Sequence, residues 1–352
     1  MSEFTKADEE IAATAPPGVK LVRTLRGHTK TIGRIAWSPD GRMLASPSDD
    51  TTIRLWDAQT GECLRVLEGH TSDVYSAAFD RAGRLLASGG HDRTIKIWEA
   101  GGGNLIRTID DADTVNSVAF DPIGRTLAGG GLDNTIKLWE PTSGCLLHTL
   151  AGHDNWVKAV SFDTTSRRLA SASDDGTVKL WDPASGKLLF TLRGHQGTVS
   201  SVAFDFRGTT LASASYDETI KLWDPAGGKL LRTLEGHTEF INSADFLFDG
   251  TLLAAKGSHS AIRLWNTQSG ETLAIMAEPS SGIIFPGLAF HPSLPLLATV
   301  GSDPGTPEDE CDQLIHIWEL DLARLLGHPV EPSAHDVNAK RVCSSGADKP
   351  VI

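Results

Sequence analysis

The sequence has few of the features that mark secreted, membrane or metal-binding proteins. It holds 4 cysteines and no C-x-x-C pair, which disfavours a disulfide or zinc framework (Cys63, Cys145, Cys311 and Cys343). No apolar run approaches the roughly 20 residues that a transmembrane helix needs. The first 17 residues carry acids and no apolar stretch like that of a secretory signal. These absences predict a cytoplasmic protein without membrane contact.

Basic residues are also in deficit. Lys and Arg number 32 against 45 Asp and Glu, a formal net charge of −13, which disfavours a general affinity for nucleic acid. What the chain has in quantity is glycine (35) and proline (17), residues that interrupt long elements. The composition therefore favours an all-β protein of many short strands.

A repeat of about 42 residues runs through the chain. Its clearest marker is a tryptophan at the end of a short apolar run, at Trp56, Trp98, Trp139, Trp181, Trp223, Trp265 and Trp318. A Gly-His pair stands 28 residues before five of these tryptophans, with its histidine at His28, His70, His153, His195 and His237. Internal repeats of this length are typical of solenoids and propellers.

One period contains four strand-like runs separated by Gly, Asp and Pro. In the fifth repeat they are residues 199–204, 210–213, 219–223 and 229–234. Four antiparallel strands make a small sheet with two apolar faces, which a single copy cannot bury. Copies must stack face to face around an axis, so seven tryptophans predict a seven-bladed β-propeller.

Over roughly residues 19–328 this pattern resembles the WD40 repeat family. The resemblance implies that histidine, serine, aspartate and tryptophan form a hydrogen-bonded tetrad inside each complete blade. Complete sets occur in blades one, two, four and five: His28, Ser46, Asp50, Trp56; His70, Ser88, Asp92, Trp98; His153, Ser171, Asp175, Trp181; and His195, Ser213, Asp217, Trp223. Buried polar groups of this kind contribute to stability because each donor and acceptor is paired.

Three blades depart from the tetrad and are expected to be locally softer. Blade three has Asp111 and Gly129 in the His and Ser positions. Blade six keeps His237 but has Ala255 and His259 in place of Ser and Asp. Blade seven offers Thr299 and Asp312 without a preceding Gly-His pair.

The ends of the repeat array indicate how the ring closes. Residues 19–25 match a fourth strand but have no first three strands ahead of them, so they are expected to be the outer strand of the last blade. Residues 322–328 also match a fourth strand, which leaves one outer strand too many. We therefore divide the chain into a flexible N-terminal tail (1–17), the propeller (18–328) and a segment (329–352) that is either a tail or a truncated eighth repeat.

Catalysis by the Ser, His and Asp of the tetrads is not expected. A nucleophile must be exposed beside its base, whereas the same set recurs four times under a tryptophan. The chain also lacks Gly-x-Ser-x-Gly, His-Glu-x-x-His and a Walker loop. We predict a protein that is not an enzyme and that uses no cofactor and no metal.

Some residues are left unexplained by the repeat. In WD40 proteins the loops into the first strands and the turns between second and third strands form a top face that binds partners. Of the two tryptophans outside the seven repeat positions, Trp37 takes a first-strand position that other repeats fill with phenylalanine, so only Trp156 is unassigned. Both tyrosines of the chain map to this face. The predicted partner-binding residues are Trp156, Tyr75, Tyr216, Phe240, Lys158, Asn116, Asn242, His91, Asp49 and Asp174.

The charged residues of blade seven are acidic. No Lys or Arg occurs between Arg263 and Arg324, and an inserted acidic loop contains Asp303, Glu308, Asp309, Glu310 and Asp312. Such a loop is expected to steer a basic partner segment, with strong salt dependence. Calcium binding is a rival explanation, but the spacing lacks the Asp-x-Asp-x-Asp-Gly pattern. A merely solvated loop is the third interpretation.

Together these patterns predict a monomeric, non-catalytic scaffold that binds other proteins or peptides through the top face. A first alternative is a regulatory or sensor module of a larger signalling ATPase, kinase or protease. A second is an enzyme that uses the central channel, for which His91 with Asp49 and Asp174 is the only candidate cluster.

Overall fold

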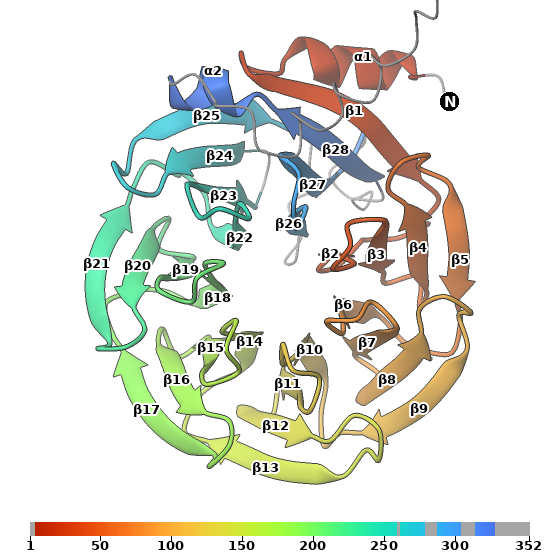
Figure 1. The fold of residues 1–352 in the computed structure, drawn as a ribbon, viewed down its shortest axis with the longest axis vertical. Helices are drawn as coiled ribbons and strands as arrows, with labels where there is room; N and C mark the ends of the chain where they lie inside the picture. Colours follow the sequence, from red (N-terminus) through yellow and green to blue (C-terminus); the bar gives the residue numbers. More distant parts are fainter. Residues whose placement is uncertain (1–3, 259–260, 279–286, 304–313, 328–352) are drawn as a thin grey trace, which may run out of the picture.

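The computed structural model describes residues 4–258, 261–278, 287–303 and 314–327. They form seven four-stranded antiparallel sheets arranged as blades around a central axis (Figure 1). The predicted all-β, seven-bladed propeller is confirmed. Neither described helix has the length and apolar character to span a bilayer.

Blades one to four each take four consecutive strands. Blade one is β2 (Ala36–Trp37), β3 (Met43–Pro47), β4 (Ile53–Asp57) and β5 (Cys63–Leu67). Blade two is β6 (Val74–Phe79), β7 (Leu85–Gly90), β8 (Thr94–Glu99) and β9 (Leu105–Asp110). Blade three is β10 (Val115–Phe120), β11 (Leu127–Gly131), β12 (Thr135–Trp139) and β13 (Leu146–Ala151). Blade four is β14 (Val157–Phe162), β15 (Leu169–Ser173), β16 (Val178–Asp182) and β17 (Lys187–Leu192).

Blades five and six follow the same plan, and blade seven closes the ring. Blade five is β18 (Val199–Phe204), β19 (Leu211–Ser215), β20 (Ile220–Asp224) and β21 (Lys229–Leu234). Blade six is β22 (Ile241–Phe246), β23 (Leu252–Gly257), β24 (Ala261–Asn266) and β25 (Thr272–Ala277). Blade seven is β26 (Leu288–Phe290), β27 (Leu296–Gly301), β28 (Leu314–Leu320) and the N-terminal β1 (Val19–Arg26).

The predicted closure by an N-terminal outer strand is confirmed. Strand β1 pairs antiparallel with β28, from Val19 opposite Leu320 to Arg26 opposite Leu314, and the two run side by side in Figure 1. The prediction of a second outer strand at residues 322–328 is wrong. Leu322–Leu326 is the short helix α2, capped by the Asp321 side chain and ended by Gly327 at φ 68°. A helix there leaves β28 free to pair with β1.

Part of the segment assigned to a flexible N-terminal tail has regular structure. Lys6–Ala13 forms helix α1, in which Thr5 and Asp8 make a capping box. Asp8 is buried, and its carboxylate accepts hydrogen bonds from Thr24 (2.5 Å) and Arg26 (3.0 Å) of β1. Ile11 packs in the same apolar cluster as Leu325 of α2. The two helices thus cover the seam where the ring closes.

The core repeats between each pair of neighbouring blades. In the first of these interfaces Leu55 of blade one packs with Val74 and Trp98 of blade two, each at most 1% exposed. Six further clusters join the remaining blades in the same way. Each blade therefore buries its second face only against its neighbour, as the repeat argument requires.

The structure brings each of the four complete tetrads together. Histidine Nδ1 lies 2.7–2.8 Å from the aspartate and Nε2 2.7–2.8 Å from the serine hydroxyl. The tryptophan indole donates to the same hydroxyl at 2.8–2.9 Å. Burial acts to raise the aspartate pKa, but the bonds from histidine and from a threonine two residues on hold it below its ordinary value.

The three blades without a complete tetrad have different polar contacts at the tetrad positions. In blade three Lys137 hydrogen-bonds both Asp111 and Asp133. A Cβ at Gly129 would lie 2.9 Å from the Trp139 ring, so a side chain there would require its neighbours to move. In blade six His237 Nε2 and Trp265 Nε1 are buried without a hydrogen-bond partner among the described residues. His259 lies outside those residues.

Blade seven holds its tryptophan through a network that the repeat pattern did not predict. The Trp318 indole donates to Thr299 at 2.9 Å, and Thr299 donates to Glu278 at 2.5 Å. His316 Nδ1 lies 2.6 Å from Glu278, and Lys256 of blade six forms an ion pair with the same carboxylate. All four polar side chains are 0% exposed. Glu278 is the carboxylate of this network. Asp312 lies outside the described residues, so its predicted place in the blade stays a prediction.

Candidate functional site

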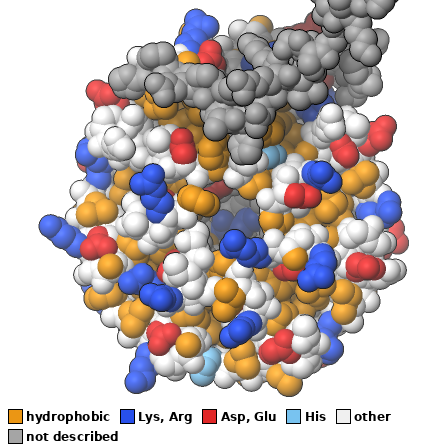
Figure 2. Space-filling model, viewed as in Figure 1, with side chains coloured by type: hydrophobic (Ala, Val, Ile, Leu, Met, Phe, Trp, Pro, Cys, Tyr) orange, Lys and Arg blue, Asp and Glu red, His pale blue; other side chains and the backbone are white. Residues whose placement is uncertain are grey.

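The first strands of the blades surround the axis and are tied to each other by side chains. Ser76, Ser117 and Ser201 each accept a backbone N–H from the next first strand. The Asn116 amide donates to Val157 O at 3.0 Å, and the Ser200 hydroxyl donates to Ile241 O at 2.5 Å. Figure 2 shows a hollow at the axis with Lys or Arg side chains at its mouth and in its depth.

Asn116 and Asn242 are buried at this ring. They are 2% and 3% exposed, and the Asn116 amide serves the inter-blade bond just described. The structure therefore places these two predicted binding residues in the wall of the ring, beneath the surface of the top face. The Asn116 amide contributes by joining the first strands of blades three and four.

Trp156 is the exposed centre of the predicted site. Its side chain is 45% exposed, in the loop that leads into β14. The Lys158 ammonium lies 5.8 Å from the ring centroid and 4.0 Å from the Asp174 carboxylate. The backbone N–H of Asp174 donates to Trp156 O at 3.0 Å, which ties the β15–β16 turn to the loop. Burial lowers the pKa of Lys158, and Asp174 partly offsets this effect.

Tyr216 and Phe240 form the second aromatic element. Their rings stack with centroids 5.0 Å apart and planes at 16°. Phe240, from the loop into β22, is 52% exposed, while Tyr216, from the β19–β20 turn, is half-buried. Burial raises the pKa of Tyr216, and the nearby Asp174 adds to the rise. Asp174 thus lies between the two aromatic elements of blades four, five and six.

Arg34 is a site residue that the predictions missed. Arg34 lies just before β2 of blade one, and its guanidinium donates across the axis to Lys158 O (3.3 Å) and Ser200 O (2.7 Å). Burial lowers its pKa to about 10. The position six residues after the repeat histidine is serine or alanine in blades two to six, so an arginine there was a detectable signal. Arg34 fixes blade one to blades four and five through the channel.

The remaining predicted residues lie on the other side of the top face. Tyr75 contacts His91 edge to face, with centroids 6.4 Å apart, and His91 Nδ1 lies 3.1 Å from the Thr114 hydroxyl. Burial, with repulsion from Asp73, raises the pKa of Asp49 to about 6. This group belongs to blades one to three.

His91, Asp49 and Asp174 do not form one cluster. His91 contacts Tyr75 and Thr114, whereas Asp174 lies with Lys158. Within the described ranges no group of three or more His, Cys, Asp or Glu could hold a metal ion. The described residues therefore do not bring together the cluster on which the channel-enzyme alternative was based.

Only one residue of the predicted acidic loop is described. Asp303 accepts a hydrogen bond from Arg26 at 3.1 Å, which joins β1 to the region after β27. Glu308, Asp309, Glu310 and Asp312 lie outside the described residues. The loop's effect on a basic partner stays a prediction.

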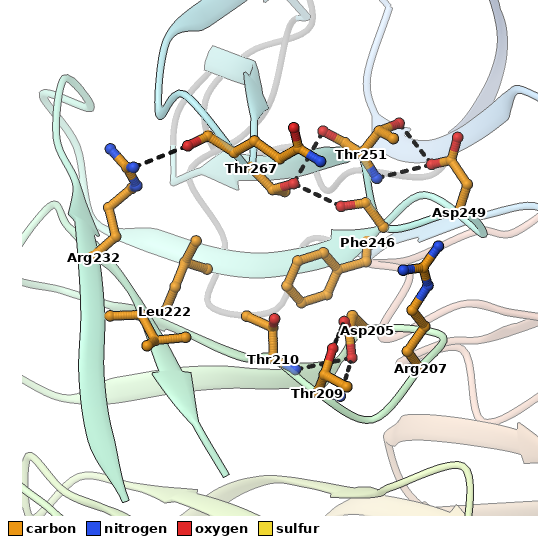
Figure 3. A pocket seen from close by; sticks show the side chains of 13 residues that line it. Asp205, Arg207, Thr209, Thr210, Leu222, Arg232, Phe246, Asp249, Thr251 and Thr267 are labelled. Atoms are coloured by element: carbon orange, nitrogen blue, oxygen red, sulfur yellow. Dashed lines mark hydrogen bonds between the residues drawn. The ribbon is translucent and has the colours of Figure 1, made fainter. Parts of the chain in front are cut away.

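A hollow of about 360 Å³ between blades five and six, shown in Figure 3, is lined by groups already engaged in the fold. Asp205 accepts from Thr209 and Thr210, and Asp249 accepts from Thr251. Arg232 donates to the backbone of the β24–β25 turn at 2.9 Å. These bonds shape the turns of the two blades.

Comparison with known proteins identifies the repeat. The family described as "WD domain, G-beta repeat" matches residues 19–57, 61–99, 103–140, 144–182, 186–224 and 228–266. Each match starts with an outer strand and ends on a third strand, so the matched unit is offset from the blade by one strand. That offset is what lets β1 complete the last blade.

Similar curated proteins match over short stretches. Protein Mut11 of Chlamydomonas reinhardtii is 47% identical over 58 residues, 16% of each chain. A probable cytosolic iron-sulfur protein assembly protein, Ciao1 of Culex quinquefasciatus, is 58% identical over 36 residues, 10% of this chain and 11% of its own. A subunit of chromatin assembly factor 1 from Mus musculus is 38% identical over 55 residues, 16% of this chain and 10% of its own. The matched part thus spans a sixth or less of each of these relatives.

Proposed function

The chain belongs to the WD40 repeat family, and from this premise we propose that it is a non-catalytic scaffold that binds a partner protein or peptide on its top face. The observation that carries the proposal is the aromatic rim over blades four to six: Trp156 beside Lys158, and Phe240 stacked on Tyr216. Large, exposed aromatic side chains on rigid loops are typical of interaction hot spots.

Preorganisation is the mechanism that the geometry supports. Trp156 is held by the backbone bond to Asp174, and Tyr216 is held by its own backbone N–H to Thr198 O at 2.9 Å. Arg34 fixes the opposite side of the ring to the same blades. A partner therefore meets a surface whose loops need little ordering, which lowers the entropic cost of association.

The relatives' names are consistent with work inside assemblies. Two of those above are named as an iron-sulfur protein assembly protein and as a subunit of a chromatin assembly factor. We carry over only the general role of a protein-binding subunit. A cytoplasmic monomer that binds a basic segment near blade seven remains part of the proposal, as does the alternative of a regulatory module of a larger signalling protein.

The test compares two sets of three alanine substitutions in affinity capture from native lysate. The first set is Trp156→Ala, Tyr216→Ala and Phe240→Ala. The matched control set removes exposed apolar side chains from outer strands: Ile106→Ala, Leu147→Ala and Leu189→Ala, 53%, 46% and 42% exposed. Both sets are first shown to melt like the wild type.

We expect a partner that the wild type and the control set retain and that the top-face set loses, by tenfold or more in affinity. Each aromatic hot spot removed costs about 2 kcal/mol or more. Equal capture by all three proteins would place the binding surface elsewhere and overturn the top-face assignment.

A further inference from the structure

The face opposite the top face carries a hollow of a different character. It is formed by the turns between first and second strands of blades five, six, seven, one and two, and measures about 530 Å³. Five phenylalanines line it: Phe204, Phe206, Phe246, Phe248 and Phe290. Phe206 is 68% exposed, and Phe248 is half-buried. Aromatic side chains gathered around a hollow, with some of them exposed, are typical of a contact surface.

One carboxylate opens into this aromatic hollow. Asp245 stands at the next-to-last position of β22, where the other six first strands have Ala36, Ala78, Ala119, Ser161, Ala203 and Ala289. The acid is therefore an exception to a position that is otherwise small. The repeat does not require a charge there, because six blades pack without one.

The carboxylate is only partly satisfied. One oxygen accepts the Phe246 N–H and the other accepts the Phe290 N–H of blade seven, both at 2.9 Å. Each oxygen of a carboxylate can accept two hydrogen bonds, so acceptor capacity remains on both. Burial raises the pKa of Asp245 to about 6, and no ion pair to it occurs in the described part of the chain. A carboxylate in apolar surroundings is stabilised by a cation.

We propose that this hollow binds a lysine side chain of a partner protein, with the ammonium against Asp245 and the methylene stem against Phe206 and Phe248. An ammonium offers three hydrogen-bond donors to the free acceptor sites, and aromatic faces attract cations. The apolar stem of lysine covers apolar surface while its charged end reaches a polar group. The site lies on the opposite face from the aromatic rim of the proposed function and does not depend on it.

Arg81 provides a way to distinguish a bound cation from a bound anion. It lies in the β6–β7 turn and lines the same hollow, with an exposed side chain. A bound cation would be repelled by Arg81, whereas a bound anion would be attracted to it. Removing Arg81 therefore has opposite effects on the two classes of ligand.

The test uses n-butylammonium, which has the chemistry of the lysine side chain, and n-butanol as its uncharged counterpart. The isotope-labelled full chain is titrated at pH 7.5 and followed by the amide signals of Phe246 and Phe290, whose N–H groups donate to Asp245. We expect saturable shifts with butylammonium and binding of butanol at least tenfold weaker. Equal binding of the two would show an apolar hollow only and overturn the proposal.

Two variants provide the controls. Asp245→Asn keeps the shape of the side chain and is expected to weaken butylammonium binding at least tenfold. Arg81→Ala is expected to tighten it about twofold or more. Unchanged binding by Asp245→Asn, or weaker binding by Arg81→Ala, would overturn the site. Thermal melting of both variants shows that they fold.

A last arm separates a protein lysine from a free amine. The acetylated, amidated peptide Gly-Phe-Lys-Phe-Gly is compared with the same peptide acetylated on the lysine. We expect the unmodified peptide to bind more tightly than butylammonium and the acetylated one to lose binding tenfold or more. A chain that binds butylammonium but neither peptide would restrict the hollow to small amines and overturn the assignment to a partner lysine.

Discussion

Blade five and blade six have their tryptophan and histidine at the same positions, but only blade five completes the hydrogen bonds between them. In blade five Ser213 accepts from Trp223 and lies 2.8 Å from His195 Nε2. In blade six Ala255 stands at that position, and the ring nitrogens His237 Nε2 and Trp265 Nε1 have no partner among the described residues. Two neighbouring blades of one ring therefore keep their shape with different polar bonding.

Blade six has its buried polar network at the border with blade seven. Lys256 lies one residue after Ala255, and its ammonium forms an ion pair with Glu278. The same carboxylate bonds Thr299 and His316 of blade seven. In blade five the buried polar bonds lie within the blade, whereas at blade six they join it to blade seven, the blade that closes the ring. Comparing the two regions shows that the tetrad is one solution among several to holding a blade tryptophan.

The largest effect is expected from Lys256→Met. It leaves the Glu278 carboxylate buried without its cation, and breaking a buried ion pair from one side costs about 3–5 kcal/mol. We expect a loss of that size in the free energy of unfolding, measured by urea denaturation. The matched control is Lys179→Met in blade four, where the 6% exposed lysine bonds only the Thr191 hydroxyl among the described residues. That variant should lose about 1 kcal/mol.

Equal losses in the two lysine variants would show that the inter-blade network contributes no more than an ordinary hydrogen bond. The double variant Lys256→Met, Glu278→Gln sharpens the point. It removes both charges, so it should recover part of the stability that Lys256→Met loses.

Acidification should open blade six before blade five. Burial, helped by the Arg263 charge, lowers the pKa of His237 to about 4, so the folded state increasingly loses stability as pH falls from about 6.5 to 4. In blade five burial also lowers the pKa of His195, but the hydrogen bond and charge of Asp217 partly offset this effect, so the loss of stability over the same pH range is smaller. The pKa of Asp217 is lowered to about 2, and its contribution is lost only as pH falls from about 4 toward 2. The predicted effect on blade six is about 3 kcal/mol at most.

Hydrogen exchange measured by mass spectrometry, corrected for the intrinsic pH dependence, checks this order. Between pH 6.5 and 4, strands β22–β25 should lose more protection than β18–β21. Simultaneous loss in the two blades would mean that they open as one unit.

The parts of the fold that could be predicted depend on spacing within one repeat. The 28 residues from histidine to tryptophan contain three strands, so the residues of the complete tetrads are fixed relative to each other by a single sheet. Closure could be predicted for a similar reason, since residues 19–25 match a fourth strand that has no blade of its own. Helix α2 was missed although Asp321 and Gly327 are ordinary helix-capping residues.

What could not be predicted involves bonds between blades. The template says nothing about which side chain of one blade faces which side chain of the next, so the Lys256–Glu278–His316 network was missed. Arg34 and His316 nevertheless differ from the residues at the equivalent positions of the other repeats. Arg34 stands where five repeats have serine or alanine, and His316 stands where six repeats have lysine or arginine. Comparing the repeats column by column would have marked both, though not their partners.

The smallest expected effect is also the most specific, the repair of blade six by Ala255→Ser. The serine hydroxyl would donate to His237 Nε2 and accept from the Trp265 indole, as Ser213 does between His195 and Trp223. Satisfying these groups should raise the free energy of unfolding by about 1 kcal/mol. The reverse change in blade five, Ser213→Ala, leaves His195 Nε2 and Trp223 Nε1 without their hydrogen-bond partner. It should lower the free energy of unfolding by about 1–3 kcal/mol.

The two substitutions form a pair because they exchange one hydroxyl at equivalent positions, both 0% exposed. Urea unfolding of each variant and of the double variant gives the comparison directly. If Ala255→Ser gains nothing while Ser213→Ala still loses, then blade six has relaxed around its missing serine, and its ring nitrogens no longer lie where a hydroxyl can bond both. If the gain matches the expectation, the missing serine hydroxyl accounts for the unpaired ring nitrogens His237 Nε2 and Trp265 Nε1.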